Sequence, residues 1–393
     1  MKFHQAHLSY CTNIHPAETW SETFVMLSTH VLAVRDRLRA NGDLGANEAF
    51  AIGLRLSAVA ARELLENDHL AIFKAWLEET NTYVFTINGF PYGSFHGTRV
   101  KEQVFKPDWT EQARVDYTKD LFRILAVIAR PETGASVSTL PGSHKTFHAD
   151  EATIRRNLID LALWLEEFAA ETGHDFHLGL EPEPLGHFEN TAETLAFFER
   201  LHAEAPDSRI LQQRIGVNYD TCHFALEYDE ARCSLDALTR AGIRISKIHL
   251  SSAIALDPRD PAAIEAILPF DEAVYFHQVI LKQSDGELHR FADLPLFFEA
   301  TRNGTLVPGD YEEVRIHFHI PLDAEPAAPL RSTRNETAVV LDWKRDHPDA
   351  CRHYEIETYT WGVLPDELQR PVEEQIAGEY AWVSKTTAKG IDD

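Results

Sequence analysis

Three carboxylic acids and one histidine lie at the ends of four separate apolar stretches of this chain. Glu181 ends Leu-Gly-Leu-Glu, Asp220 ends Val-Asn-Tyr-Asp, His249 lies in Lys-Ile-His-Leu, and Glu357 lies in Glu-Ile-Glu-Thr. If the fold brings them together, three carboxylates and an imidazole can share a dry pocket only with a neutralising partner. A divalent cation is such a partner, and mixed oxygen and nitrogen donors suit Mn²⁺, Mg²⁺, Co²⁺ or Zn²⁺. The pattern predicts one divalent metal bound by these four residues.

The fourth acidic ligand has a competitor on the same stretch. Glu355 precedes Glu357 by two residues, so in a strand both side chains point to the same face. Glu357 is the preferred ligand because it lies nearer to the C-terminal end of the stretch. Glu355 would lie one layer lower, and the residues alone leave both assignments open.

Other polar residues are candidates for contact with a substrate. Asn13 and His15 follow the first apolar stretch, although they could instead cap a loop and face solvent. His317 and His319 are two residues apart in a strand-like pattern and therefore share one face. They could line the mouth of a pocket, bind a second metal, or simply pack on a sheet.

These residues need a fold that aligns the ends of several strands. Short apolar runs alternate with helical patterns along the chain. In one helical pattern, apolar residues recur every three or four positions from Trp20 to Leu38, and this helix is predicted to end at Asn41-Gly42. The alternation implies parallel strands, and no GxGxxG or GxxxxGK[ST] motif supports a nucleotide-binding sheet. Eight strands predict an α/β fold, the (β/α)8 TIM barrel, in which catalytic groups lie at the C-terminal ends of strands. The predicted strands are 7–13, 51–56, 83–89, 136–140, 177–181, 215–220, 245–250 and 352–358.

The interval between the seventh and eighth strands is unusually long. It contains β-rich runs and a hairpin signal at Ser284-Asp-Gly286. We expect residues 1–393 to form one barrel domain, with 255–330 as an inserted β-rich segment on its C-terminal face and 366–393 as a C-terminal tail.

Composition limits the classes of partner. There are 37 Lys and Arg against 62 Asp and Glu, a formal charge of -25, which disfavours nucleic acid and anionic membrane surfaces. Four cysteines without a CxxC pair, and an N-terminus without an apolar signal region, indicate a cytoplasmic protein. No run reaches the roughly 18 apolar residues of a membrane helix, so no membrane insertion is expected.

The order of the polar residues also resembles a known superfamily. Glu on the fifth strand, Asp-x-x-His on the sixth, Ile-His on the seventh and Glu on the eighth resemble the xylose-isomerase-like barrels, which include sugar epimerases, inosose dehydratases and endonuclease IV. Nearly the whole chain, including the insertion, is most similar to the EboE-type proteins of the ebo metabolite traffic gene cluster. The stretches that carry this resemblance are His7-Leu-Ser-Tyr-Cys-Thr-Asn-Ile-His15-Pro, Gly-Leu-Arg-Leu-Ser57, Leu-Glu-Pro-Glu-Pro184, Asn-Tyr-Asp-Thr-Cys-His223, Lys-Ile-His-Leu-Ser-Ser252, His-Phe-His-Ile-Pro321 and Glu-Thr-Tyr-Thr-Trp361.

The resemblance implies roles for individual residues. It assigns Glu181, Asp220, His249 and Glu357 to the metal, and it makes His223 a contact for a substrate oxygen. The loop that ends in His187, a further predicted substrate contact, lacks the second glutamate of the sugar epimerases at their spacing. The epimerase arginine that follows the seventh-strand histidine is also missing. Sugar epimerisation in its usual form is therefore in doubt.

The function expected from these features is a metal-dependent isomerase or epimerase. Glu181 or Glu357 would move a proton next to a carbonyl of a small polyol-like or hydroxy-carbonyl metabolite. Two alternatives stay open: a metal-containing binding protein of a carrier pathway, and a metal-dependent phosphoester hydrolase. Expected partners are a small-molecule substrate and other proteins of the same gene cluster.

Overall fold

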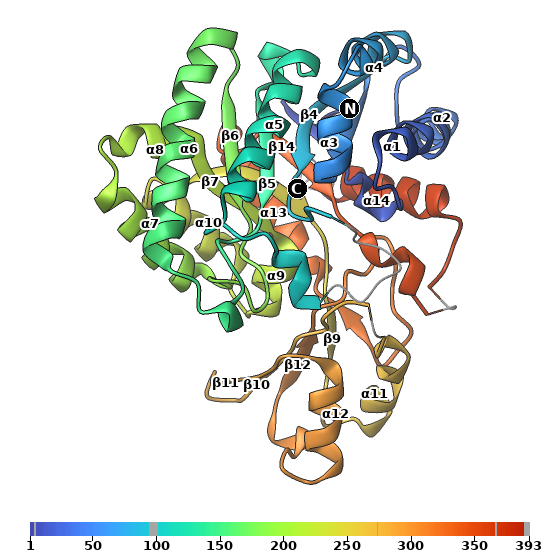
Figure 1. The fold of residues 1–393 in the computed structure, drawn as a ribbon. Helices are drawn as coiled ribbons and strands as arrows, with labels where there is room; N and C mark the ends of the chain where they lie inside the picture. The colour runs from blue at the N-terminus through green and yellow to red at the C-terminus, as the bar shows by residue number, and fades with distance from the viewer. Residues whose placement is uncertain (4, 94–100, 273, 366–367, 389–393) are drawn as a thin grey trace.

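Eight parallel strands form a nearly closed barrel, which confirms the predicted (β/α)8 fold (Figure 1). The computed structural model describes residues 1–3, 5–93, 101–272, 274–365 and 368–388. Neighbouring strands follow the order β2-β14-β8-β7-β6-β5-β4-β3, and a parallel bridge between Cys11 and Gly53 joins the two ends. The barrel strands are β2 (Ala6–Tyr10), β3 (Phe50–Arg55), β4 (Thr82–Asn88), β5 (Ala135–Thr139), β6 (Phe176–Leu180), β7 (Ile215–Asp220), β8 (Arg244–Leu250) and β14 (His353–Ile356). A short strand, β1 (Lys2–Phe3), pairs antiparallel with β2.

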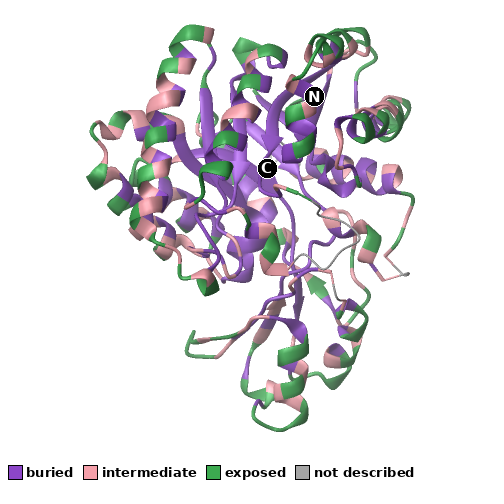
Figure 2. Ribbon diagram, viewed as in Figure 1, coloured by how far each residue is buried: buried purple, intermediate pink, exposed green. Residues whose placement is uncertain are grey.

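Helices surround the barrel and bury their apolar faces on it (Figure 2). The helix α6 shows how the sequence sets its bounds: the Asp150 side chain accepts from the backbone N of Ala152, and Gly173 ends the helix with φ 76°. The helix predicted from Trp20 contains a π turn over Leu27–Val31. The helices are α1 (Trp20–Met26), α2 (Leu32–Asn41), α3 (Ala58–Leu65), α4 (His69–Glu79), α5 (Gln112–Ile128), α6 (Glu151–Thr172), α7 (Thr191–Glu204), α8 (Ser208–Arg214), α9 (Thr221–Leu226), α10 (Ala231–Arg240), α13 (Arg334–Asp346) and α14 (Val372–Ala388).

Between β8 and β14 the chain builds a second, antiparallel sheet, which extends from the barrel in Figure 1. Its strand order is β11-β10-β12-β9-β13, and a separate cluster of apolar side chains forms its core. The hairpin β10-β11 turns at Gly286, which has φ 91°. The elements are β9 (Ile254–Leu256), α11 (Pro261–Ala266), β10 (Val279–Lys282), β11 (Leu288–Phe291), α12 (Leu294–Arg302), β12 (Glu313–Ile316) and β13 (Arg331–Ser332).

The C-terminal segment supplies the helix that follows the last barrel strand. The helix α14 contacts α2 and α13, and its Tyr380 is buried with its ring 6.1 Å from that of Phe50. Residues 366–367 and 389–393 of the predicted tail lie outside the described residues.

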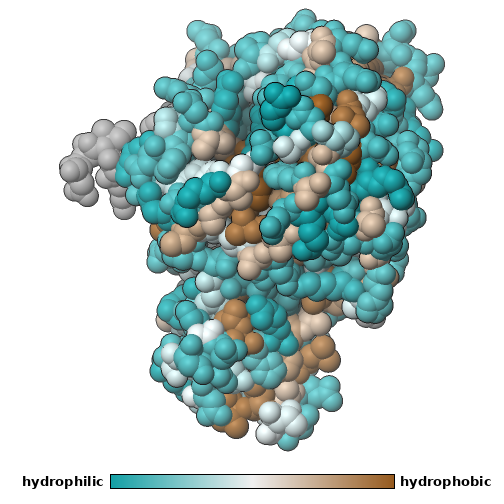
Figure 3. All heavy atoms as spheres, turned by 90° about the vertical axis from the view of Figure 1, so that its left-hand side faces the viewer, coloured by the Kyte–Doolittle hydropathy of each residue, from teal (hydrophilic) through white to brown (hydrophobic). Residues whose placement is uncertain are grey.

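The face seen in Figure 3 is mostly hydrophilic, with smaller apolar patches over the barrel and the inserted segment. Among the described residues, no helix combines the length and the apolar composition needed to cross a bilayer.

Candidate metal centre

The four residues predicted as metal ligands converge at the C-terminal end of the barrel. Glu181 and Glu357 directly follow β6 and β14, Asp220 ends β7, and His249 lies near the end of β8. All four are buried, and each offers a ligand atom within 4.8 Å of the other three. His249 Nδ1 lies 3.0 Å from Glu181 Oε1, 3.0 Å from Glu357 Oε2 and 3.6 Å from Asp220 Oδ2. The imidazole nitrogen therefore faces three carboxylates at one point.

The geometry separates the roles of Glu355 and Glu357. Glu357 belongs to the group of four, whereas Glu355 lies deeper in the barrel and accepts from Lys247 Nζ at 2.6 Å and from His249 Nε2 at 2.8 Å. Burial raises the pKa of Glu355, but the charges and hydrogen bonds of Lys247 and His249 together outweigh burial and lower that pKa to about 2. Glu355 is thus the buried counter-ion of Lys247 and orients His249 from below, which favours Glu357 as the ligand.

The two carboxylate oxygens of Asp220 have different surroundings: Oδ1 is hydrogen-bonded, whereas Oδ2 is positioned to bind a cation. Its Oδ1 accepts from the backbone N of Cys222 at 2.7 Å and of His223 at 3.1 Å, so Asp220 is the N-cap of α9. Ser251 Oγ donates to the same oxygen at 2.6 Å. Among the described residues no donor lies within hydrogen-bond distance of the buried Asp220 Oδ2, and the nearest nitrogen given, His249 Nδ1, is 3.6 Å away. A metal ion would relieve this costly state. The three-residue spacing in Asp-x-x-His is therefore the spacing between an N-cap residue and the backbone N–H that its side chain accepts from.

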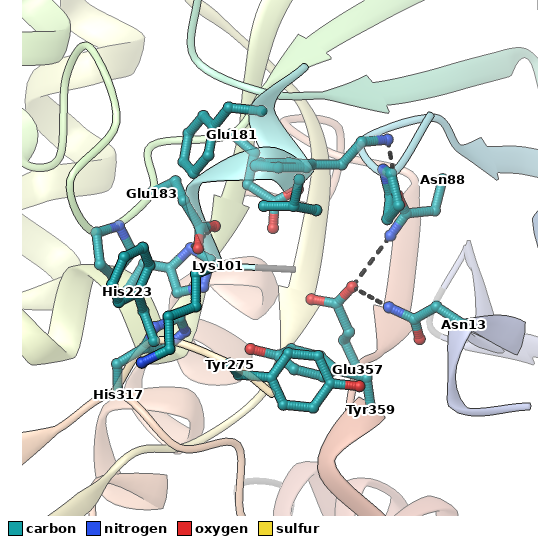
Figure 4. A pocket seen from close by; sticks show the side chains of 16 residues that line it. Asn13, Asn88, Lys101, Glu181, Glu183, His223, Tyr275, His317, Glu357 and Tyr359 are labelled. Carbon is teal, nitrogen blue, oxygen red and sulfur yellow. Dashed lines mark hydrogen bonds and ion pairs between the residues drawn. The ribbon is translucent and has the colours of Figure 1, made fainter. Parts of the chain in front are cut away.

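Two amides fix the carboxylate of Glu357. Asn13 Nδ2 donates to Glu357 Oε1 at 2.8 Å, and Asn88 Nδ2 donates to the same oxygen at 3.0 Å (Figure 4). The Asn88 side chain is itself held, because its Oδ1 accepts from the backbone N of Phe90 at 3.0 Å. Oε2 of Glu357 remains directed at His249. Asn13, predicted as a substrate contact, thus also orients a predicted ligand.

Buried charges shift the pKa values of the site. Burial lowers the pKa of His249, but the Glu357 and Glu181 carboxylates outweigh it and hold that pKa well above its ordinary value. Burial raises the pKa of Glu183 well above its ordinary value, and the charges of Glu181 and Asp220 add to the effect. In the absence of a cation, protons on His249 and Glu183 therefore reduce the negative charge of the site.

A cavity reaches this site at Glu181 and Glu357, and residues of the barrel loops and of the inserted segment line it (Figure 4). Aromatic rings form much of its wall, and Lys101, which forms an ion pair with Asp293 of the inserted segment, lies at its edge. The residues lining it are Asn13, Asn88, Phe90, Pro91, Lys101, Val104, Phe105, Glu181, Glu183, Pro184, His223, Tyr275, Phe276, His317, Glu357 and Tyr359.

The predicted histidines divide into two groups. His223 and His317 line the cavity, and His319 is buried beside them. His15 instead stacks on His30 with its Nε2 3.1 Å from Tyr10 Oη. His187 Nε2 lies 2.9 Å from Glu151 Oε2 of α6. Neither His15 nor His187 is among the described residues that line the cavity, so the structure does not bring these two predicted substrate contacts to the site.

Sequence reasoning missed Glu183, Lys247 and Asn88. Glu183 and Lys247 each lie two residues from a predicted ligand, and side chains two apart in extended chain point the same way. The same two-residue periodicity, counted from Glu181 on strand five and from His249 on strand seven, would have predicted Glu183 and Lys247 as residues near the site. Asn88 ends β4, inside the predicted strand 83–89, but its amide was not among the predicted site residues.

No protein-family model and no curated protein matches the chain. Solved structures with similar folds include a probable 3-DHS dehydratase, AsbF, from Bacillus anthracis, at 12% identity and a TM-score of 0.47, covering 98% of this chain and 99% of that one. A zinc-bound IOLI protein is 11% identical with a TM-score of 0.49, over 97% and 98% of the two chains. An L-ribulose 3-epimerase is 12% identical with a TM-score of 0.48, over 99% and 98%.

Proposed function

We propose that this protein is a metal-dependent isomerase or epimerase that moves a proton next to a carbonyl of a small polyol-like or hydroxy-carbonyl metabolite. The observation that carries the proposal is the convergence of Glu181, Asp220, His249 and Glu357 within 4.8 Å of one another. Two of the four, Glu181 and Glu357, line the cavity. The oxygen and nitrogen donors of the four residues suit Mn²⁺, Mg²⁺, Co²⁺ or Zn²⁺. The donor-free Oδ2 of Asp220 supports a cation at this point.

The chemistry divides between the cation and the carboxylates. When bound, the cation would act as a Lewis acid toward the carbonyl oxygen and so lower the barrier to loss of the adjoining proton. Glu181 or Glu357 would remove and return that proton. Glu183 is a third carboxylate in the cavity, and burial raises its pKa well above the ordinary value, which favours its protonated form.

The cavity limits the substrate. Phe90, Phe105 and Tyr359 give it apolar walls, while Asn13 and Asn88 supply amides beside Glu357. A few fixed polar groups in an apolar pocket favour a small metabolite over a polymer. His223 donates its Nδ1 proton to the carbonyl of Pro182 at 2.8 Å, which leaves Nε2 as an acceptor for a hydroxyl group.

The biological setting is part of the same proposal. The resemblance to EboE-type proteins suggests that the metabolite belongs to an ebo-type traffic pathway in the cytoplasm. Other proteins of that gene cluster would then supply or receive it.

The test uses deuterium. Protein loaded with each of the four metals is incubated in deuterated water with sugars, inososes and phosphate esters, and the products are read by mass spectrometry and NMR. We expect deuterium at a carbon next to the carbonyl, abolished by Glu181→Gln and unaffected by Glu167→Gln, which alters an exposed residue of α6. Recovery of a co-purified ligand unchanged after metal addition would instead favour a binding protein.

A second candidate is metal-dependent phosphoester hydrolysis. The observation that favours it is the group of histidines, His223, His317 and His319, directly beside Asp220, because paired cations are common in phosphoester hydrolysis. Phosphate release without deuterium uptake in the same experiment would replace the isomerase proposal with this one.

A further inference from the structure

The inserted segment supplies three of the side chains that line the cavity: Tyr275, Phe276 and His317. Tyr275 and Phe276 precede β10, and His317 directly follows β12. Figure 4 shows Tyr275 beside Tyr359, which follows the last barrel strand, and their ring centroids are 5.1 Å apart. The three inserted side chains form one wall of the cavity, the inserted wall. All three lie outside the helices and strands, so the shape of this wall depends on individual hydrogen bonds.

His277 connects the two stretches that carry the inserted wall. Its side chain is buried. Its Nδ1 lies 2.9 Å from the carbonyl oxygen of His317, and its Nε2 lies 2.9 Å from Glu272 Oε1. A carbonyl oxygen can only accept a hydrogen bond, so Nδ1 carries a proton. Whether Nε2 carries a second proton depends on the charge of Glu272.

Glu272 has the hydrogen-bond partners of an ionised carboxylate. Its Oε2 accepts from the backbone N of Val274 at 2.6 Å, and its Oε1 accepts from the backbone N of Tyr275 at 2.9 Å. Burial raises the pKa of Glu272, but the hydrogen bonds from His277 and from these two backbone groups outweigh it and lower that pKa. An ionised carboxylate can only accept, so Nε2 of His277 carries a proton as well.

We infer that His277 carries a proton on both ring nitrogens and is a positioning residue for the inserted wall. On one side the ring holds Glu272, which in turn holds the backbone of Tyr275, and on the other side it holds the backbone of His317. A ring with one proton could make only one of these two bonds. The inference rests on the proposed function only in treating this cavity as the substrate site.

A second set of contacts ties His277 to the barrel. Its backbone N donates to Asp293 Oδ1 at 3.1 Å, and the same oxygen accepts from the backbone N of Leu294 at 3.0 Å. Asp293 Oδ2 forms the ion pair with Lys101, which lies in the segment between β4 and α5. The contacts therefore run from Lys101 through Asp293 to His277, so the inserted wall has a fixed position relative to the barrel.

The effect of this positioning should fall on binding rather than on proton transfer. In the described part of the chain, the hydrogen bonds of His277 and Glu272 reach none of the four predicted metal ligands. A wall that contacts the substrate equally before and during the reaction contributes uniform binding, and its loss raises KM while kcat stays unchanged. A general loss of structure would lower kcat as well.

The first test needs no substrate. NMR of protein with 15N-labelled histidine, at pH 7, shows which ring nitrogens carry protons, and His277→Gln identifies the signals of His277. We expect two protonated nitrogens in the wild type and in the control Glu287→Gln, which alters an exposed residue of the same segment. We expect one in Glu272→Gln. A single protonated nitrogen in the wild type would overturn the inference, whether or not the protein is an enzyme.

Amide hydrogen exchange, followed by mass spectrometry, measures how firmly the wall is held. We expect exchange in 274–277 to be faster in Glu272→Gln and in His277→Gln than in the wild type and Glu287→Gln, because the backbone N–H groups of Val274 and Tyr275 lose a fixed acceptor. Equal exchange in all four proteins would overturn the positioning role. Circular dichroism checks that each variant is folded.

The second test uses the deuterium assay of the proposed function, with a compound from its panel of sugars, inososes and phosphate esters that the wild type labels. We expect KM to rise about 10-fold in His277→Gln and Glu272→Gln, with kcat within roughly twofold of the wild type. Unchanged KM in these folded variants, or a fall in kcat alone, would overturn the positioning role. If the wild type labels no compound, the proposed function fails, and the NMR and amide-exchange results still decide this inference.

Discussion

Glu355 Oε2 accepts a hydrogen bond from His249 Nε2 at 2.8 Å, one layer below the three carboxylates that face the other nitrogen of the same ring. The proton on Nε2 leaves Nδ1 as the atom directed at Glu181 and Glu357. Lys247 Nζ, 2.6 Å from the same oxygen of Glu355, completes a chain from ammonium to carboxylate to imidazole. A charge pair buried in the barrel therefore decides which nitrogen of His249 can bind a metal.

The first prediction concerns this supporting pair. Glu355→Gln alone would leave the Lys247 ammonium buried without a counter-ion, so the informative variant combines it with Lys247→Met. We expect the double variant to fold and to bind metal about 10–100-fold more weakly, because the orienting partner of a histidine ligand is lost. Titration with Mn²⁺ and Zn²⁺ measures the change against Glu167→Gln. Unchanged affinity in the folded double variant would limit Glu355 to a structural role.

The second prediction concerns protons. Burial lowers the pKa of His249, but Glu357 and Glu181 raise it well above its ordinary value, so the ring is protonated at neutral pH without metal. A cation at Nδ1 must displace that proton, so binding should release about one proton per chain and weaken as the pH falls. Calorimetric titration at pH 7 in buffers of different ionisation enthalpy measures the release. A heat of binding that does not depend on the buffer would contradict the assignment of His249 as a ligand.

The sequence predicted the barrel and the grouping of the four residues because both depend on regular periodicities. Apolar runs alternating with helices define parallel strands, and the carboxyl ends of such strands meet at one end of the barrel. Loop residues follow no such rule: His15 and His187 have the right residue type, but local partners, Tyr10 and Glu151, hold their side chains away from the cavity.

The pairing of Lys247 with Glu355 could have been predicted from the same strand periodicity. Each precedes a predicted ligand by two residues, and Glu355 is aligned with His249 across the neighbouring strands β14 and β8. A layer of opposite charges beneath the ligands follows from those two spacings. The closeness of His223 to the pair His317 and His319 was not predictable, because it depends on how the inserted segment folds back onto the barrel.

The third prediction tests how the barrel closes around Glu355. A Cβ added at Gly53 would overlap Glu355 Oε1 and would lie 2.5 Å from the carbonyl oxygen of Tyr10. Gly53→Ala should therefore destabilise the fold by about 1–3 kcal/mol, as overpacking does, and should weaken metal binding by displacing Glu355. Gly309→Ala is the matched control, because a Cβ there meets nothing within 4 Å. Equal stability of the two variants in urea denaturation would contradict this account.

The last prediction concerns a buried carboxyl group that is not among the predicted metal ligands. Glu379 of α14 is 1% exposed and accepts from the backbone N of Leu322 at 3.1 Å and from Thr358 Oγ1 at 2.6 Å. Burial raises its pKa to about 8; the Thr358 hydrogen bond opposes this shift, and the Asp323 charge adds to it. Glu379 is therefore protonated in the folded protein at pH values where an unfolded chain, with a pKa of about 4.3, is ionised.

Between those two pKa values the folded state binds more protons than the unfolded state, so this group's contribution to stability falls as the pH rises and levels off above about 8. The loss is at most roughly 5 kcal/mol at 1.36 kcal/mol per pKa unit. Glu379→Gln keeps an acceptor for both hydrogen bonds but cannot ionise. We expect it to match the wild type near pH 5 and to be the more stable protein at pH 9, with urea denaturation at both pH values as the measurement. A difference in unfolding free energy that stays constant from pH 5 to pH 9 would show that Glu379 does not titrate in this range.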